Sequence, residues 1–205
     1  MIVIVDYGMG NLRSVQKGLE KVGVETLVTS DPKEVKTATG IVLPGVGAFR
    51  DATVNLKKRG LDEVVIEGIR QQKPFLGICL GLQLLFEYSE EGGSPEQGYP
   101  QGFGIIKGEV VHLPRDVKVP HIGWNLIHKQ KEAPLLQGVP DETFFYFVHS
   151  YYARPKEDVV ATTTDYGLNF ASSIWKDNIF AIQFHPEKSS EAGLKILENF
   201  GRSCR

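Results

Sequence analysis

The sequence predicts an α/β fold in which helices flank a central, mostly parallel sheet, followed by an antiparallel, β-rich second half. In the first half, short apolar strands alternate with amphipathic helices, the pattern of a parallel sheet covered on both faces. After residue 103 this pattern gives way to short strands joined by tight turns. Neither a repeat nor an interdomain linker interrupts the 205 residues, so we expect one domain, 1–205.

The first half supplies the parallel strands and most of the helices. Apolar runs predict strands at residues 2–5, 24–28, 40–43 and 75–78. Apolar residues at helical spacing predict helices at residues 12–22, 49–59, 61–72 and 80–88. Asn11 can cap the first of these helices, and Gly23 ends it.

The second half supplies the antiparallel strands. Residues 89–103 are rich in Gly, Pro, Ser and Glu, which predicts an exposed loop. Strands are expected at residues 104–113, 122–127, 143–148, 159–164, 169–175 and 179–184. Ser189 or Ser190 is expected to cap a last helix.

Composition and charge argue against several classes of function. A net charge of −2 lacks the basic balance of a nucleic-acid-binding protein. The two cysteines, Cys79 and Cys204, are too few for a disulfide scaffold, so we expect free thiols in a reducing compartment. The N-terminus has no signal-peptide pattern, and the most apolar stretch, residues 74–86, is too short to cross a bilayer. We therefore expect a cytoplasmic protein without nucleic-acid or membrane partners.

Cys79 lies at an expected strand-to-helix turn, within the sequence Gly-Ile-Cys-Leu-Gly. This arrangement parallels the nucleophile elbow, in which glycines allow a sharp turn and leave space around the nucleophile. A helix N-terminus favours the thiolate form of such a cysteine, and the N–H of Leu80 can face a developing oxyanion. The alternative is a buried cysteine in a plain tight turn, because free cysteines are commonly buried.

His185 and Glu187 follow another expected strand and can complete a proton shuttle. Residues two apart in an extended chain project to the same side, so Glu187 can reach back and orient His185. The alternative is a surface glutamate beside an ordinary loop histidine. Sites in open parallel sheets form beyond the carboxyl ends of strands, so Cys79 and His185 can meet although they are 106 positions apart. A Cys–His–Glu set performs acyl transfer through a thioester.

The glycines of residues 44–49 offer a second source of oxyanion donors, although an ordinary Gly/Pro loop explains them equally well. Cofactor chemistry has no support, because the chain contains neither the dinucleotide-binding nor the phosphate-binding glycine motif. The Cys-x-x-Cys and His-Glu-x-x-His spacings of zinc sites are also missing. We therefore expect no cofactor and no metal.

Two motifs resemble those of the class I (triad) glutamine amidotransferases: Gly-Ile-Cys-Leu-Gly-Leu-Gln at 77–83 and Phe-His-Pro-Glu at 184–187. Within that family, Asp-Tyr-Gly-Met-Gly-Asn-Leu at 6–12 and His-Ile-Gly-Trp-Asn at 121–125 are similar to the glutaminase subunits of imidazole glycerol phosphate synthase. The resemblance implies an α/β glutaminase that releases ammonia from L-glutamine through a Cys-linked thioester.

The resemblance also implies roles for individual residues. The family uses a catalytic triad, which here is Cys79, His185 and Glu187. Its oxyanion hole consists of backbone N–H groups, expected here among Val46, Gly47 and Leu80. It holds the amino-acid end of glutamine with residues expected here to be Gln83, Ser150 and Tyr151.

A partner follows from the resemblance as well. Such subunits deliver ammonia to a (β/α)8-barrel cyclase subunit, which makes imidazole glycerol phosphate and aminoimidazole carboxamide ribotide in histidine biosynthesis. We therefore expect a heterodimer. The expected partner-facing residues are His121, Trp124 and Asn125, although a tryptophan on a strand is also typical of a buried core.

Three other functions are compatible with the sequence. The chain can be the glutaminase subunit of another amidotransferase, for example one that serves anthranilate synthesis. It can be a non-catalytic docking module on the same fold, although the complete set of Cys79, His185 and Glu187 argues against this. It can also be a cysteine hydrolase that acts on γ-glutamyl peptides, which would require a wider pocket.

Overall fold

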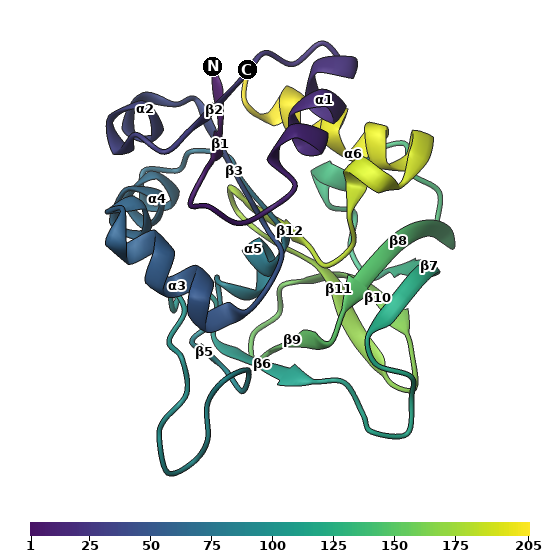
Figure 1. Ribbon diagram of the computed structural model, residues 1–205. Coiled ribbons are helices and arrows are strands. Elements are labelled where there is room, and N and C mark those ends of the chain that lie inside the picture. Colours follow the sequence, from purple (N-terminus) through teal and green to yellow (C-terminus); the bar gives the residue numbers. More distant parts are fainter.

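The computed structural model describes residues 1–205, and its main sheet has nine strands in the order β2-β1-β3-β4-β12-β11-β10-β7-β8 (Figure 1). The first five in this order are parallel neighbours: β2 (Thr26–Thr29), β1 (Ile2–Val5), β3 (Gly40–Gly45), β4 (Phe75–Cys79) and β12 (Ile179–Ile182). The others pair antiparallel: β11 (Asn169–Lys176), β10 (Val160–Asp165), β7 (His121–Lys129) and β8 (Thr143–His149). This topology confirms the predicted α/β fold with an antiparallel second half.

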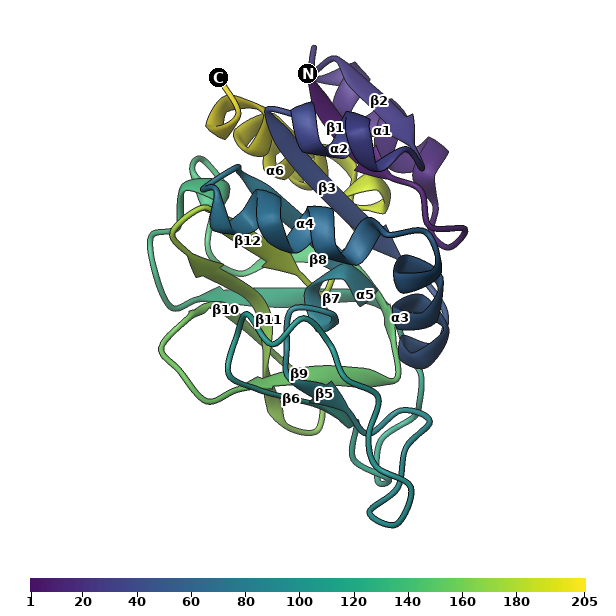
Figure 2. The same ribbon diagram turned by 90° about the vertical axis from the view of Figure 1, so that its left-hand side faces the viewer.

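Helices cover both faces of the parallel strands (Figures 1 and 2). One face carries α1 (Leu12–Lys21) and α6 (Ser190–Ser203), and the other carries α2 (Pro32–Thr37), α3 (Phe49–Lys58) and α4 (Leu61–Arg70). The side chains of β1 alternate between the two cores. Ile2 and Ile4 belong to the cluster beneath α1 and α6, whereas Val3 and Val5 belong to the cluster beneath the other three helices. The strand is apolar throughout because both of its faces are buried.

A smaller, three-stranded sheet lies at the end of the molecule away from α1 and α6 (Figure 2). Its strands, in spatial order, are β5 (Tyr88–Ser89), β6 (Gly108–His112) and β9 (Tyr151–Pro155). The chain passes from β8 of the main sheet directly into β9 of the smaller one. Ser150 and Tyr151 therefore lie at the corner between the two sheets.

The helix predicted after Cys79 is much shorter than expected. It is the single turn α5 (Leu80–Gln83), whereas the apolar pattern predicted a helix up to Tyr88. The carbonyl groups of Leu84, Leu85 and Phe86 accept hydrogen bonds from N–H groups of residues 103–106 instead of continuing the helix. This non-local pairing, which the local pattern does not contain, ends the helix.

Other boundaries and caps also differ from the predictions. Pro44 and Gly45 extend β3 rather than ending it, because they pair with the last two residues of β4. Helix α2 and strand β9 were not predicted, and β6 begins four residues later than expected. The side chains of Asn11 and Ser189 do not cap α1 and α6. The Ser189 hydroxyl instead donates to the carbonyl of His185 (2.6 Å).

No helix in the structure has the length and apolar character needed to span a membrane.

Candidate active site

The chain turns sharply at Cys79, the last residue of β4. Its backbone angles, φ 55° and ψ −105°, are unusual for a residue with a side chain and cost about 1–3 kcal/mol. The flanking glycines are required by close contacts. A Cβ atom on Gly81 would lie 1.8 Å from the carbonyl oxygen of Leu43, and one on Gly77 would lie 2.6 Å from that of Gly81. The Gly-x-Cys-x-Gly spacing is therefore a steric requirement of the turn.

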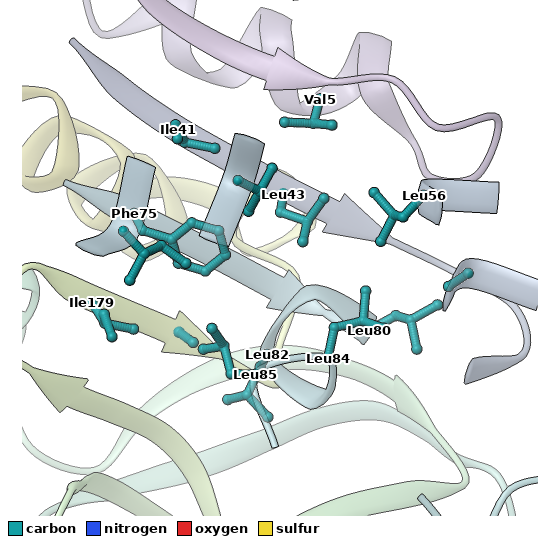
Figure 3. Close-up of a cluster of buried hydrophobic side chains, with 14 of the residues drawn as sticks. Val5, Ile41, Leu43, Leu56, Phe75, Leu80, Leu82, Leu84, Leu85 and Ile179 are labelled. Atoms are coloured by element: carbon teal, nitrogen blue, oxygen red, sulfur yellow. The ribbon is translucent and has the colours of Figure 1, made fainter. Parts of the chain in front are cut away.

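The segment after Cys79 is anchored in the core, which offsets the strain. Four leucines of this segment are buried in the cluster that Figure 3 shows: Leu80, Leu82, Leu84 and Leu85. Burial of one such side chain stabilises a fold by about 1.5–3 kcal/mol, so the four together exceed the strain at Cys79. The strained turn is thus held by its neighbours.

His185 and Glu187 form a buried pair. The distance from His185 Nδ1 to Glu187 Oε1 is 2.9 Å, and the two side chains are 2% and 1% exposed. Burial alone would lower the pKa of His185, but its interactions with Cys79 and Glu187 raise that pKa to about 10. Since Nδ1 is taken by Glu187 and Nε2 has no hydrogen-bond partner in the protein, Nε2 is the nitrogen left to exchange a proton with the thiol.

A pocket of about 460 Å³ opens beside Cys79. Its lining includes all the residues predicted to form the oxyanion hole and to bind the substrate, namely Val46, Gly47, Leu80, Gln83, Ser150 and Tyr151. His185 and Glu187 are not part of the lining, because His185 lies behind Cys79 and Glu187 is hydrogen-bonded to His185. The structure therefore brings the sequence-predicted residues to one place from segments far apart in the chain.

The turn after β3 can supply oxyanion donors. No hydrogen bond within the protein uses the N–H groups of Val46 or Gly47, so both are available to a ligand in the pocket. Gly47 has φ 102°, which favours glycine, and a Cβ atom on Gly45 would lie 2.8 Å from Cβ of Leu80. The two predicted sources of oxyanion donors are thus neighbours.

Comparisons with known proteins bear on the same residues. The sequence model of the family described as "Glutamine amidotransferase class-I" matches residues 3–204 of this chain. The chain belongs to this family.

Several relatives of this amidotransferase carry one name. "Imidazole glycerol phosphate synthase subunit HisH" of Aquifex aeolicus is 55% identical over 204 residues, which cover 98% of this chain and 96% of the relative. The protein of the same name from Moorella thermoacetica is 53% identical over 205 residues, which cover 100% and 95%.

Solved structures show the same fold at low sequence identity. The structure of PurLQS from Thermotoga maritima has a TM-score of 0.77 at 17% identity, covering 97% of this chain and 96% of that chain. A crystal structure described as a glutamine amidotransferase has a TM-score of 0.74 at 18% identity, covering 98% and 100%.

The pocket of this amidotransferase contains one carboxylate that the sequence did not reveal. Glu91 lines the pocket, and its Oε2 accepts a hydrogen bond from the N–H of Phe49 (2.8 Å), the first residue of α3. Ala48, at the N-cap of that helix, has no side chain able to cap it, so Glu91 does so. Burial raises the pKa of Glu91, and the Phe49 N–H opposes this shift. Glu90 and Glu91 are adjacent in a polar loop, and nothing in the sequence distinguishes them.

Gln83 and Gln183 link the pocket wall to the nucleophile. Gln83 Nε2 donates to the carbonyl oxygen of Tyr151 (3.0 Å) and to Gln183 Oε1 (3.1 Å). Gln183 Nε2 in turn lies 3.4 Å from Cys79 Sγ. Gln183 is completely buried, and the sequence by itself predicts no role for it.

The structure corrects the expected surface position of His121. This side chain is only 3% exposed, stacks on Tyr166, and has Nδ1 3.0 Å from Nε2 of His149. Burial lowers the pKa of His121 to about 4 and that of His149 to about 3. Trp124, in contrast, is 50% exposed and lies at the surface.

The alternation of side chains along β7 explains the difference. Residues three apart on a strand point to opposite sides, so His121 faces the interior while Trp124 faces outward. Asn125 shares the side of His121 and is partly exposed. Its amide donates to the carbonyl oxygen of Asp165 (2.9 Å) and lies 3.3 Å from His121 Nε2.

Proposed function

We propose that this amidotransferase is the glutaminase subunit of imidazole glycerol phosphate synthase and that residues 1–205 act as one glutaminase domain. Cys79 at its strained turn, beside the buried His185–Glu187 pair and a pocket, is the observation that carries the chemistry. The choice of synthase is supported by relatives that share 53–55% identity over nearly the whole chain. In this role the chain hydrolyses L-glutamine to glutamate and ammonia for histidine biosynthesis.

The triad performs the hydrolysis in two halves. The Cys79 thiolate attacks the carboxamide carbon of glutamine, and the N–H groups of Leu80 and of Val46 or Gly47 stabilise the oxyanion. The His185 imidazolium then gives its proton to the leaving ammonia as the thioester forms. Water attacks the thioester as His185 takes a proton from it, which releases glutamate and restores the thiolate.

Pocket residues bind the amino-acid end of the substrate. Both N–H groups of the Gln83 amide are used inside the protein, so its Oε1 is left to accept from glutamine. The Glu91 carboxylate suits the α-ammonium group, because its second oxygen is free of the helix cap. The backbone at Ser150 and Tyr151 completes the site.

An apolar surface beside the pocket suits the cyclase partner. Three side chains on the β7–β8 pair are 50–59% exposed: Ile122, Trp124 and Phe144. Val148 of β8 and Pro120, just before β7, line the pocket, so this surface continues to the active site. A (β/α)8-barrel cyclase seated here can receive ammonia before water protonates it. Trp124 is the proposed contact residue, whereas His121 and Asn125 support the strand from its other side.

The catalytic part is tested in the complex with the cyclase. Cys79→Ala should abolish synthesis of imidazole glycerol phosphate from glutamine and leave synthesis from added ammonium salt intact. Because the ammonium reaction needs only a folded cyclase, it serves as the internal control. Glutamine-dependent synthesis at the wild-type rate would disprove the mechanism. Mixing the chain with the synthase component of an anthranilate synthase tests the other amidotransferase role, and anthranilate formation from glutamine would overturn the choice of synthase.

The partner surface has its own test. Trp124→Ala should weaken binding to the cyclase by about 10–30-fold, the loss of about 1.4–2 kcal/mol that an aromatic anchor supplies. Val54→Ala is the matched control, because Val54 is equally exposed (56%) but lies on α3. If calorimetry gave equal affinities for the two variants, the interface with the cyclase would not include Trp124.

A further inference from the structure

We propose that Gln183 is a fourth catalytic residue, which donates a hydrogen bond to the Cys79 sulfur and stabilises the thiolate before it attacks. The proposal deepens the proposed function and rests on Cys79 being its nucleophile. It concerns a side chain that neither the triad nor the oxyanion hole uses.

Gln183 lies beside the sulfur, two positions before His185 in the chain. It follows the end of β12, and its backbone N–H donates to the carbonyl of Ser172 (2.8 Å), which fixes the main chain. Gln183 and His185 are two positions apart where the chain bends after β12, and both side chains interact with Cys79. Gln183 Nε2 lies 3.4 Å from Sγ, a normal distance for a hydrogen bond to sulfur. Gln183 is therefore the side chain that donates a hydrogen bond to this sulfur, whereas His185 is its proton partner.

The orientation of the Gln183 amide follows from a backbone group. The carbonyl oxygen of Tyr151 can only accept, so Gln83 must turn its NH₂ group toward it. The same NH₂ group donates to Gln183, which must therefore present its oxygen to Gln83. The Gln183 NH₂ group is left facing Cys79. Flipping either amide would place two oxygens, or two NH₂ groups, against each other.

The same carbonyl is fixed from its other side. His149 Nδ1 lies 2.9 Å from the Tyr151 oxygen and must donate to it, so His149 Nε2 is the acceptor for His121 Nδ1 at 3.0 Å. Both rings are neutral, because burial holds their pKa values well below 6.5. Each hydrogen bond in the series that links His121 to Cys79 through the intervening groups therefore has only one possible donor and one possible acceptor.

The short helix after Cys79 explains why such a donor is needed. A long helix would stabilise a thiolate at its N-terminus, but α5 has only four residues and therefore a small dipole. The thiol is largely buried, and a buried charge without hydrogen-bond donors is unfavourable. The Gln183 amide supplies a donor that carries no charge and takes no part in proton transfer.

Other titratable groups surround the sulfur and must be considered in any pH experiment. His185 is its proton partner, with Glu187 behind it, and Glu91 and His149 line the adjoining pocket. The Tyr7 phenol is fully buried, and burial together with the charge of Cys79 raises its pKa. A substitution at Gln183 leaves the identity of each of these side chains unchanged.

The test measures how Cys79 reactivity depends on pH. In Gln183→Met, which keeps the length of the side chain without the donor, the midpoint of Cys79 alkylation by iodoacetamide should rise by about one to two pH units. Turnover of glutamine at pH 7 in the complex should fall by about 10–100-fold and recover as the pH is raised. An unchanged midpoint in the folded variant would overturn the proposal.

Two internal references sharpen this experiment. Cys204 is half-buried, and burial raises its pKa to about 12 against the opposing N-terminal charge, so its alkylation should not change. Asn199→Leu is the matched control, because Asn199 is also a buried amide with two hydrogen bonds but lies on α6. It should lower stability without moving the Cys79 midpoint. If the Cys79 midpoint shifted equally in Asn199→Leu and in Gln183→Met, the shift would come from a general loosening of the fold, and the proposal would be overturned.

A second variant covers the case in which Gln183→Met does not fold. Gln183→Glu keeps the shape and the acceptor for Gln83 but replaces the donor with a carboxylate, so the midpoint should rise further than in Gln183→Met. An unchanged midpoint in this variant would also overturn the proposal. Failure of the proposed function looks different, because Cys79→Ala would then still hydrolyse glutamine whatever stands at position 183.

Discussion

The substitution Glu187→Gln tests how the carboxylate acts on the proton shuttle. Glu187 Oε1 accepts a hydrogen bond from His185 Nδ1 at 2.9 Å, and neither side chain is more than 2% exposed. A hydrogen bond to a charged group in such a site contributes about 1.5–3 kcal/mol, which corresponds to about 10–150-fold in rate. Loss of the carboxylate should also lower the pKa of His185 from about 10, because Glu187 is one of the groups that raise it.

The tautomer of His185 adds to this loss. An amide at position 187 can turn its NH₂ group toward Nδ1, which moves the ring proton to Nε2, where the thiol proton must be accepted. In a Ser–His–Asp triad the equivalent change lowers kcat by about 10⁴-fold. We therefore expect Glu187→Gln to reduce kcat by about 10²- to 10⁴-fold, with a smaller effect on KM.

The assay is steady-state glutamate formation by the complex with the cyclase at saturating glutamine. Glu198→Gln is the matched control, because Glu198 is a residue of α6 at the surface that pairs with Lys195 and Arg202. This control should retain the wild-type kcat. If Glu187→Gln does the same, the carboxylate does not orient His185 and the reasoning is refuted.

Three further predictions concern folding, substrate binding and pH. Gly81→Ala should destabilise the fold by about 3 kcal/mol or more, since its Cβ atom meets the Leu43 carbonyl; an unchanged urea midpoint would contradict the steric argument. Glu91→Gln should raise KM for glutamine by about tenfold or more with little change in kcat, and equal kinetics would remove Glu91 from the ammonium site. Stability should fall as the pH drops from about 6.5 to 5, because the unfolded chain protonates its histidines there while burial keeps His121 and His149 neutral until about pH 4 and 3. His185, with its raised pKa of about 10, has the opposite effect, but mainly above about pH 6.5; a flat urea-unfolding profile between about pH 6.5 and 5 would contradict the prediction.

Much of the candidate site could be predicted from sequence because its constraints are local. The glycines around Cys79 are needed by contacts within a few residues and with the adjacent strand, and they leave a recognisable spacing. The His185–Glu187 pair depends on two residues of one short segment, although the structure places Glu187 in a 3-10 turn (Pro186–Lys188) rather than in the expected extended chain. Patterns of this kind can therefore be recognised in the sequence alone.

Glu91 and Gln183 could not be predicted in the same way. Glu91 differs from its neighbour Glu90 only because α3, 42 positions earlier, needs a cap at Phe49. The orientation of the Gln183 amide is set by its hydrogen bond with Gln83, 100 positions away in the chain. In that orientation its NH₂ group faces Cys79, 104 positions away. Each role is set by a partner that folding brings close.

The sequence by itself determined most of the strands and helices, the sharp turn at Cys79 and the histidine–carboxylate pair, since each depends on spacing within one segment. Only the tertiary structure decided that the helix after Cys79 stops after one turn, that His121 is buried while Trp124 is exposed, and which amide faces the sulfur. These features depend on hydrogen bonds and packing between distant segments, whose free energies exceed the local preferences that a sequence pattern records.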